Sequence, residues 1–153
     1  MNDKRRAEQI YDKILNEIIQ PMLGNKVTTN FDLEKVARLF LGNKFKGVYA
    51  RDNLPTLTRN KRYAIVNTDK SSGFGVHWIA LTLTPKKDIL VYDSYGQRYH
   101  KEVVRELRKK YKKKLRFTEK DLEQKKKEDN CGQRTLAFLL TSDQFGTDIA
   151  KWI

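Results

Sequence analysis

Sulfur and imidazole groups are scarce in this sequence. Its 153 residues include one cysteine, Cys131, and two histidines, His77 and His100. A single cysteine excludes an internal disulfide and any multi-cysteine zinc site, so the thiol is a core residue, an intermolecular partner or a reactive group. We therefore expect a protein that works in a reducing compartment and needs no metal ion.

Long apolar runs are also missing. No stretch approaches the ~20 apolar residues that a membrane-spanning helix needs, and no signal-peptide hydrophobic segment follows the basic N-terminus. These absences predict a soluble protein that has no membrane partner and is not secreted by this route. Because 153 residues with 39% apolar side chains suit one hydrophobic core, we expect residues 1–153 to form a single domain.

Acidic residues are few compared with basic ones. The chain has 19 Asp and Glu against 32 Lys and Arg, which gives a net charge of +13. Residues 101–127 alone contain thirteen Lys and Arg and five Asp and Glu, a net charge of +8. Two interpretations stay open: a solvated helix face, or a sequence-independent surface for nucleic-acid phosphates. The candidate nucleic-acid-binding residues are Arg105, Arg108, Lys109, Lys110, Lys112, Lys113, Lys114 and Arg116.

Apolar residues recur at helical spacing in four stretches of the chain. The first helix is expected to end near Pro21, and the second to be capped by Asn30 or Asp32 and to end at Gly42. The expected helices cover residues 5–20, about 32–41, 100–114 and 131–140, with a last short helix after Gly146.

Between these helices the hydrophobic pattern changes to that of β-strands. Strands are expected at residues 63–67, 76–84, 88–92 and 116–118, and a loop at residues 47–59. The proline and polar residues at 84–88 predict a tight hairpin turn between two of the strands.

This hairpin brings His77 close to Asp93 in two of its three registers. Opposed residues of an antiparallel pair have a constant sum, so a turn centred on Pro85 pairs the two directly. A turn centred on Lys86 leaves them one diagonal step apart on the same face, whereas a centre halfway between puts them on opposite faces. On one face, the carboxylate can hold the imidazole in one tautomer, as an orienting acid holds a catalytic base.

Cys131 stands at the predicted start of a helix, where unpaired amides and the helix dipole favour thiolate over thiol. Its amide can stabilise the oxyanion of a tetrahedral intermediate, and the side-chain amide of Gln124 can supply a second donor. Each residue also has a simpler interpretation. Cys131 can be a small core residue, His77 a hydrogen-bonded core histidine, Asp93 a turn former and Gln124 solvated surface. His100 remains a rival base.

Several short segments together carry a resemblance to a known family. They are Tyr63–Thr68, Gly75–Ala80, Pro85, Tyr92–Gly96, Gln124 and Asn130–Gly132, with Phe45, Gly47, Tyr49 and Pro55 upstream. Their order, the His-Trp pair and the seven-residue spacing from Gln124 to Cys131 resemble the adenain family, the adenovirus maturation proteases. This family belongs to the superfamily of SUMO and ubiquitin-like-protein proteases, and the resemblance extends over residues 45 to 140.

The resemblance implies an α+β fold in which a mixed β-sheet is packed with helices and the nucleophile lies at a helix N-terminus. It assigns Cys131 as nucleophile, His77 as base, Asp93 as orienting acid, and Gln124 with the Cys131 amide as oxyanion hole. Adenain has Glu at the acidic position, so Asp93 follows the wider superfamily. Trp78 would form a wall of the site, although it also suits a core aromatic.

The function implied is a cysteine endopeptidase that matures viral precursor proteins in the virion and the host-cell nucleus, with DNA as a polyanionic activator. We expect protein substrates, no other cofactor and a monomer. The family's activating peptide could not be held here by a disulfide, because the only cysteine is the proposed nucleophile. Two alternatives stay open: a deubiquitinase or SUMO-like isopeptidase, and a non-enzymatic basic DNA-binding virion protein.

Overall fold

The structure is a computed structural model that describes residues 2–69, 77–95, 101–118 and 129–153. The rival base His100 and the predicted oxyanion-hole residue Gln124 lie outside the described residues. Within these ranges, no helix has both the length and the apolar composition needed to cross a bilayer.

The N-terminal helix is longer than the sequence predicts. It comprises α1 (Asp3–Ile14), a π-helical turn (Leu15–Ile19) and α2 (Gln20–Leu23), and it ends at Gly24 rather than near Pro21. In the π turn the Gln20 N–H donates to the Leu15 carbonyl five residues back. This wider turn lets the helix continue past Pro21, which has no N–H to donate.

The next helix, α3 (Asn30–Leu41), is capped by Thr29, not by the predicted Asn30 or Asp32. The Thr29 hydroxyl accepts from the Asp32 N–H at 3.1 Å, and the Asp32 carboxylate accepts from the Thr29 N–H at 3.0 Å. This reciprocal pair is a capping box, so Asp32 contributes to the cap from the third helical position.

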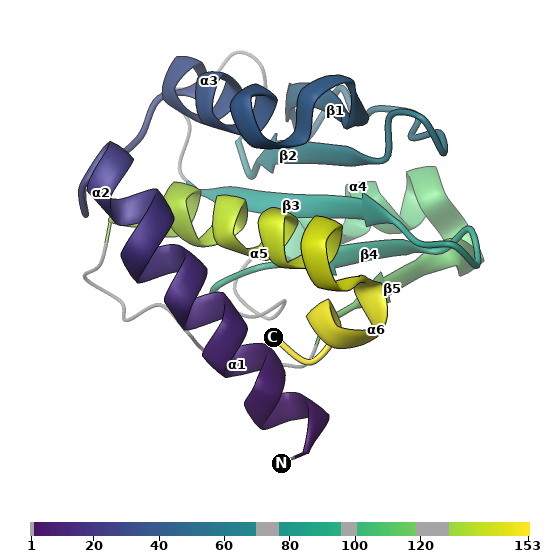
Figure 1. Cartoon of the computed structure of the whole chain (residues 1–153). Helices are drawn as coiled ribbons and strands as arrows, with labels where there is room; N and C mark the ends of the chain where they lie inside the picture. The colour runs from purple at the N-terminus through teal and green to yellow at the C-terminus, as the bar shows by residue number, and fades with distance from the viewer. Residues whose placement is uncertain (1, 70–76, 96–100, 119–128) are drawn as a thin grey trace.

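A five-stranded sheet in the order β1-β2-β3-β4-β5 forms the centre of the molecule (Figure 1). Its strands are β1 (Phe45–Ala50), β2 (Tyr63–Asn67), β3 (Trp78–Leu83), β4 (Ile89–Tyr92) and β5 (Leu115–Phe117). The two outer pairs are parallel and the two inner pairs antiparallel, so the sheet is mixed. With helices packed on it, the predicted α+β fold is confirmed.

Strand β1 is a correction, because residues 47–50 were predicted to be loop. The register with β2 shifts between Phe45 and Gly47, and Gly47 has a φ of 148°. A bulge of this kind breaks the alternating pattern by which a strand is recognised. Pairing with β2 nevertheless makes the segment a strand.

The β3–β4 hairpin has the register centred on Lys86. Ala80 lies opposite Tyr92, and the Lys87 N–H donates to the Thr84 carbonyl at 2.9 Å across the turn. Direct pairing of His77 with Asp93 is therefore wrong, and the diagonal arrangement is the one adopted. Strand β3 begins at Trp78, so His77 immediately precedes it.

Helices cover both faces of the sheet. Helix α5 (Cys131–Phe145) packs on β3 and contacts α1 and α6 (Thr147–Ala150), whereas α4 (Lys101–Tyr111) covers the other face (Figure 1). The first core includes Ile65, Ala80 and Tyr92, and the second includes Val66, Ile79 and Val91. Successive residues of each strand thus point into opposite cores, as the two-residue period of a strand requires in a sheet that is buried on both faces.

Candidate active site

His77 and Asp93 meet at one end of the sheet. His77 precedes β3 and Asp93 follows β4, and the His77 Nε2 lies 2.7 Å from the Asp93 Oδ1. Both side chains are buried, with exposed fractions of 1% and 6%. A carboxylate only accepts hydrogen bonds, so Nε2 carries a proton and Nδ1 is the nitrogen that can serve Cys131.

Tyr95 holds this pair in place and was not predicted. Its backbone N–H donates to the Asp93 Oδ1 at 2.9 Å, and its ring centre lies 4.7 Å from that of His77. An aspartate that accepts from the N–H two residues later forms an Asx turn. The signal was therefore present in the sequence, since Asp93-Ser94-Tyr95 follows directly after a strand.

Cys131 is the first residue of α5 and is partly exposed. Its side chain interacts with the His77 ring and favours the protonated form of the imidazole, which raises the pKa of His77. The Asn130 side chain does not cap the helix, because its oxygen accepts from the Arg134 guanidinium at 3.2 Å. The positive end of the helix dipole therefore faces the Cys131 side chain.

The surroundings of His77 favour its protonated form. Burial of the ring opposes protonation, but hydrogen bonds with Asp93 and Cys131 outweigh it and raise the pKa of His77 from 6.5 to about 9. At neutral pH the ring is therefore an imidazolium between two groups that carry or develop negative charge. Such a pair can supply a nucleophilic sulfur and an acid at once.

This raised pKa predicts a loss of stability at alkaline pH. The imidazolium stabilises the fold fully below the unfolded pKa of 6.5, and the contribution is lost as the pH rises through about 9. The shift corresponds to roughly 3 kcal/mol. The free energy of unfolding in urea is to be measured at about pH 6 and pH 10 for the wild type and for His77→Gln. Between these two pH values, we expect it to fall by this amount more in the wild type than in the variant. Equal losses in the two proteins would contradict the raised pKa.

Residues 24–29, a segment that we call the strap, contact both the neighbourhood of His77 and that of Cys131. The buried Gln133 amide donates to the carbonyls of Gly24 and Lys26 at 2.9 and 2.7 Å. The Trp78 indole N–H donates to the Thr28 carbonyl at 3.3 Å. Trp78, which follows His77, and Gln133, two residues after Cys131, are thus anchored to one segment, a contact between distant parts of the chain that sequence alone does not reveal.

Thr135 adds a second link between β3 and α5. Its hydroxyl lies 3.2 Å from the Trp78 carbonyl and 2.8 Å from the Cys131 carbonyl. The strand after the histidine and the helix that begins at the cysteine are therefore fixed to each other. The predicted role of Trp78 as a wall of the site stays a prediction; in the structure its side chain is partly buried against the core.

Gly132 lies where α5 meets the strap and has no room for a side chain. A Cβ at this position would overlap with the Thr28 hydroxyl and lie 2.9 Å from the Leu33 Cδ2. We expect Gly132→Ala to destabilise the fold by about 1–3 kcal/mol in urea unfolding, as overpacked cores do. Cleavage should also fall, because the neighbouring Cys131 is displaced.

The control for this prediction is the double variant Thr28→Ala, Gly132→Ala. It removes the hydroxyl that meets the new methyl group, so it should recover part of the lost stability. A single Gly132→Ala variant as stable and as active as the wild type would contradict the close packing of the strap on α5.

The predicted basic residues lie on α4, the 3-10 turn Lys112–Lys114 and β5. All eight are exposed. Arg116 pairs with Asp88 at 2.7 Å, and the Arg108 guanidinium lies 5.7 Å from the centre of the Phe117 ring. Among the described residues, no group of three or more His, Cys, Asp and Glu could hold a metal ion.

A thiol at a helix N-terminus, joined to a buried histidine that an aspartate orients, is the arrangement that cysteine peptidases use. The comparison with protein families identifies which peptidases these are. The profile of the adenovirus endoprotease family matches residues 45–135, a range that contains His77, Asp93 and Cys131, and the chain belongs to this family of viral cysteine proteases. No curated protein matches the sequence.

Proposed function

We propose that this protein is a cysteine endopeptidase that cleaves precursor proteins of a virus particle. The observation that carries the proposal is the buried His77, which lies 2.7 Å from the Asp93 carboxylate and whose pKa is raised by interaction with both Asp93 and Cys131. Family membership supports peptide-bond hydrolysis, and Cys131 is only partly buried.

The proposed reaction begins when the Cys131 sulfur attacks the scissile carbonyl carbon. A C–S bond forms and the carbonyl oxygen becomes an oxyanion, which the Cys131 amide and, by the family resemblance, Gln124 stabilise. The His77 imidazolium then gives its proton to the leaving nitrogen, and the C–N bond breaks to leave an acyl-enzyme. A water that loses its proton to His77 then attacks the thioester carbon. The C–S bond breaks, the carboxylic product is released, and the Cys131 sulfur stays on the enzyme beside a protonated His77, ready for the next cycle.

The substrate class can be tested with precursor proteins from immature particles of the encoding virus. We expect the wild-type protein to cut them at discrete sites. A ubiquitin or SUMO vinyl-sulfone probe should leave Cys131 unlabelled. Labelling by such a probe without cleavage of the precursors would replace the proposal with the isopeptidase alternative.

We also propose that the exposed basic face of α4 binds nucleic-acid phosphates, and that DNA is a polyanionic activator in the virion and the nucleus. Support comes from the exposure of Arg105, Arg108 and Lys109 on one helix. Two duplexes of unrelated sequence should bind equally, with an affinity that falls steeply with salt. Replacing these three residues by Glu should weaken binding, whereas Lys35→Glu on α3 should change it little. A DNA affinity unchanged by the triple substitution would contradict the proposal.

A further inference from the structure

A deep groove lies at the end of the molecule opposite His77 and Asp93. It has a volume of about 1240 Å³ and is lined by residues within 56–63, the end of β3 with the β3–β4 turn, the end of α4 with the residues after it, and the end of α5 with the start of α6. Strand β3 begins next to His77 and leads to the groove, a distance of ~20 Å for six residues. Figure 1 shows the two ends, with the start of α5 at one and the β3–β4 turn at the other.

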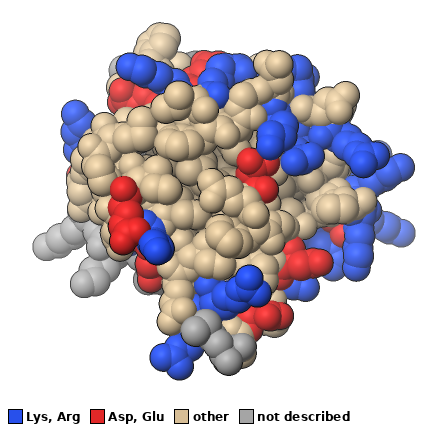
Figure 2. Space-filling model, in the orientation of Figure 1, with Lys and Arg blue, Asp and Glu red and all other residues tan. Residues whose placement is uncertain are grey.

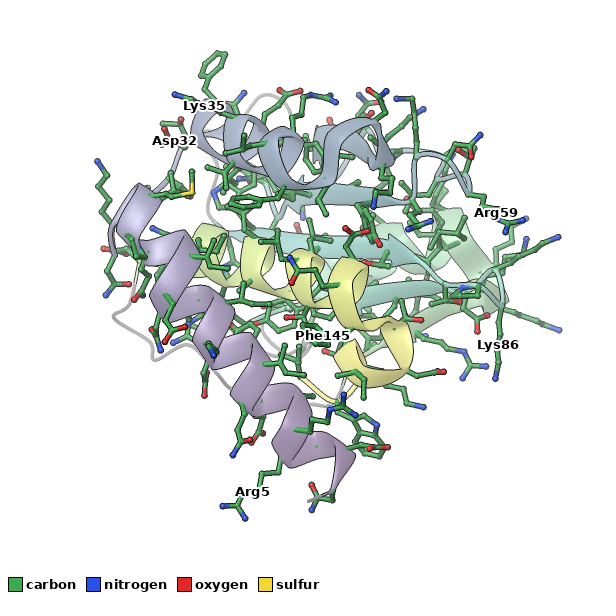
Figure 3. All side chains as sticks on the ribbon, in the orientation of Figure 1. Arg5, Asp32, Lys35, Arg59, Lys86 and Phe145 are labelled. Atoms are coloured by element: carbon green, nitrogen blue, oxygen red, sulfur yellow. The ribbon has the colours of Figure 1, made fainter. Side chains whose placement is uncertain are left out.

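The rim of the groove is strongly basic. Its cations are Arg59, Arg62, Lys87, Lys110 and Lys112–Lys114. Asp143 is the single acidic residue in the lining, and it already accepts from Lys44 at 2.7 Å and from the Tyr63 hydroxyl at 3.1 Å. Figure 2 shows Lys and Arg gathered at this end, and in Figure 3 Arg59 and Lys86 extend into solvent there.

Two of these lysines adopt a backbone conformation that favours glycine. Lys87 has a φ of 68° and Lys112 a φ of 55°, and they are the only non-glycine residues with positive φ in the described part of the chain. Lys87 closes the β3–β4 turn and Lys112 follows α4, both positions where glycine is common. We take a lysine at such a strained position as a pointer to a role for its side chain.

The floor of the groove is apolar. Leu57, Leu83 and Ile89 contribute to it, with Pro85 at the turn. Nucleic-acid phosphates would engage the rim but gain nothing from such a floor. A peptide in which acidic and apolar side chains alternate would use both, because each gains a partner of its own kind.

We propose that this groove is a docking site for an acidic, partly apolar segment of a partner protein. The rim neutralises its carboxylates and the floor buries its apolar side chains. Docking is independent of the proposed cleavage chemistry, because the groove and the catalytic candidates lie at opposite ends of β3. It can therefore be measured on the protein whether or not Cys131 is active.

Fluorescence anisotropy with three labelled probes tests the proposal. The probes are a decapeptide of alternating Glu and Leu, one of alternating Glu and Ser, and a ten-residue oligothymidylate. The Glu-Leu peptide should bind at least about tenfold more tightly than the Glu-Ser peptide, since apolar burial adds to charge. If the two peptides bind alike, if neither binds, or if the oligonucleotide binds most tightly, the proposal is overturned.

Matched glycine variants locate the binding site. The double variant Lys87→Gly, Lys112→Gly should weaken Glu-Leu binding by about tenfold and also raise the midpoint of thermal unfolding, because glycine relieves the positive φ. Lys86→Gly removes a charge from the same turn but outside the groove, and should leave binding within about twofold. A loss as large in Lys86→Gly, or a lower unfolding midpoint in the double variant, would contradict the proposal.

Discussion

Cys131→Ala is expected to reduce peptide cleavage to background. The variant has no other thiol, so nothing in the chain can replace the sulfur that forms the acyl-enzyme. Loss of a catalytic nucleophile typically lowers kcat by on the order of 10⁶-fold. The measurement is kcat/KM on a precursor-derived peptide, and a variant that still cleaves at a tenth of the wild-type rate would contradict the mechanism.

A spectroscopic control separates this loss from misfolding. Hydrogen bonding and charge interaction with Cys131 contribute to the raised pKa of His77. In Cys131→Ala that contribution disappears, so an NMR titration should place the pKa of His77 below the wild-type value of about 9. The Asp93 hydrogen bond remains, so the imidazole should stay in its buried position. An unchanged titration would show that the thiol and the ring do not interact.

Asp93→Asn is expected to cause the second-largest loss, about 10²–10⁴-fold in kcat. An asparagine oxygen can still accept from the Tyr95 N–H, so the turn should survive. Its NH₂ group, however, can donate to the His77 Nε2 and place the ring proton on Nδ1. The nitrogen that should take the proton of the Cys131 thiol is then blocked.

Two controls accompany this substitution. Asp93→Glu keeps a carboxylate and should retain more activity than Asp93→Asn. Asp88→Asn removes a carboxylate that pairs with Arg116 at the far end of β4, and should leave kcat unchanged. Activity of Asp93→Asn within about threefold of the wild type would mean that Asp93 does not orient His77.

The parts of the structure that were predicted from sequence depend on local chemistry. The period of the apolar residues indicated four of the five strands, and the turn residues around Pro85 indicated the β3–β4 hairpin. The placement of His77 beside Asp93 followed from that hairpin, once its centre is taken as Lys86. The start of α5 at Cys131 was also indicated locally, because an apolar helical stretch follows it.

The parts that were missed depend on contacts between distant residues. Strand β1 was missed because the bulge at Gly47 hides its alternation, and only pairing with β2 reveals it. The strap depends on Gln133 reaching the carbonyl of Lys26. The far groove combines residues from four separate parts of the chain, so no local pattern could have indicated it.

The central claim is that His77 activates Cys131 for nucleophilic attack. The rate of Cys131 alkylation by iodoacetamide near neutral pH measures this directly, because the thiolate is the reacting form. We expect wild-type Cys131 to react faster than free cysteine, and His77→Ala to lose that advantage. If Cys131 reacts no faster than free cysteine, or reacts equally fast without His77, it is not the activated nucleophile of a protease.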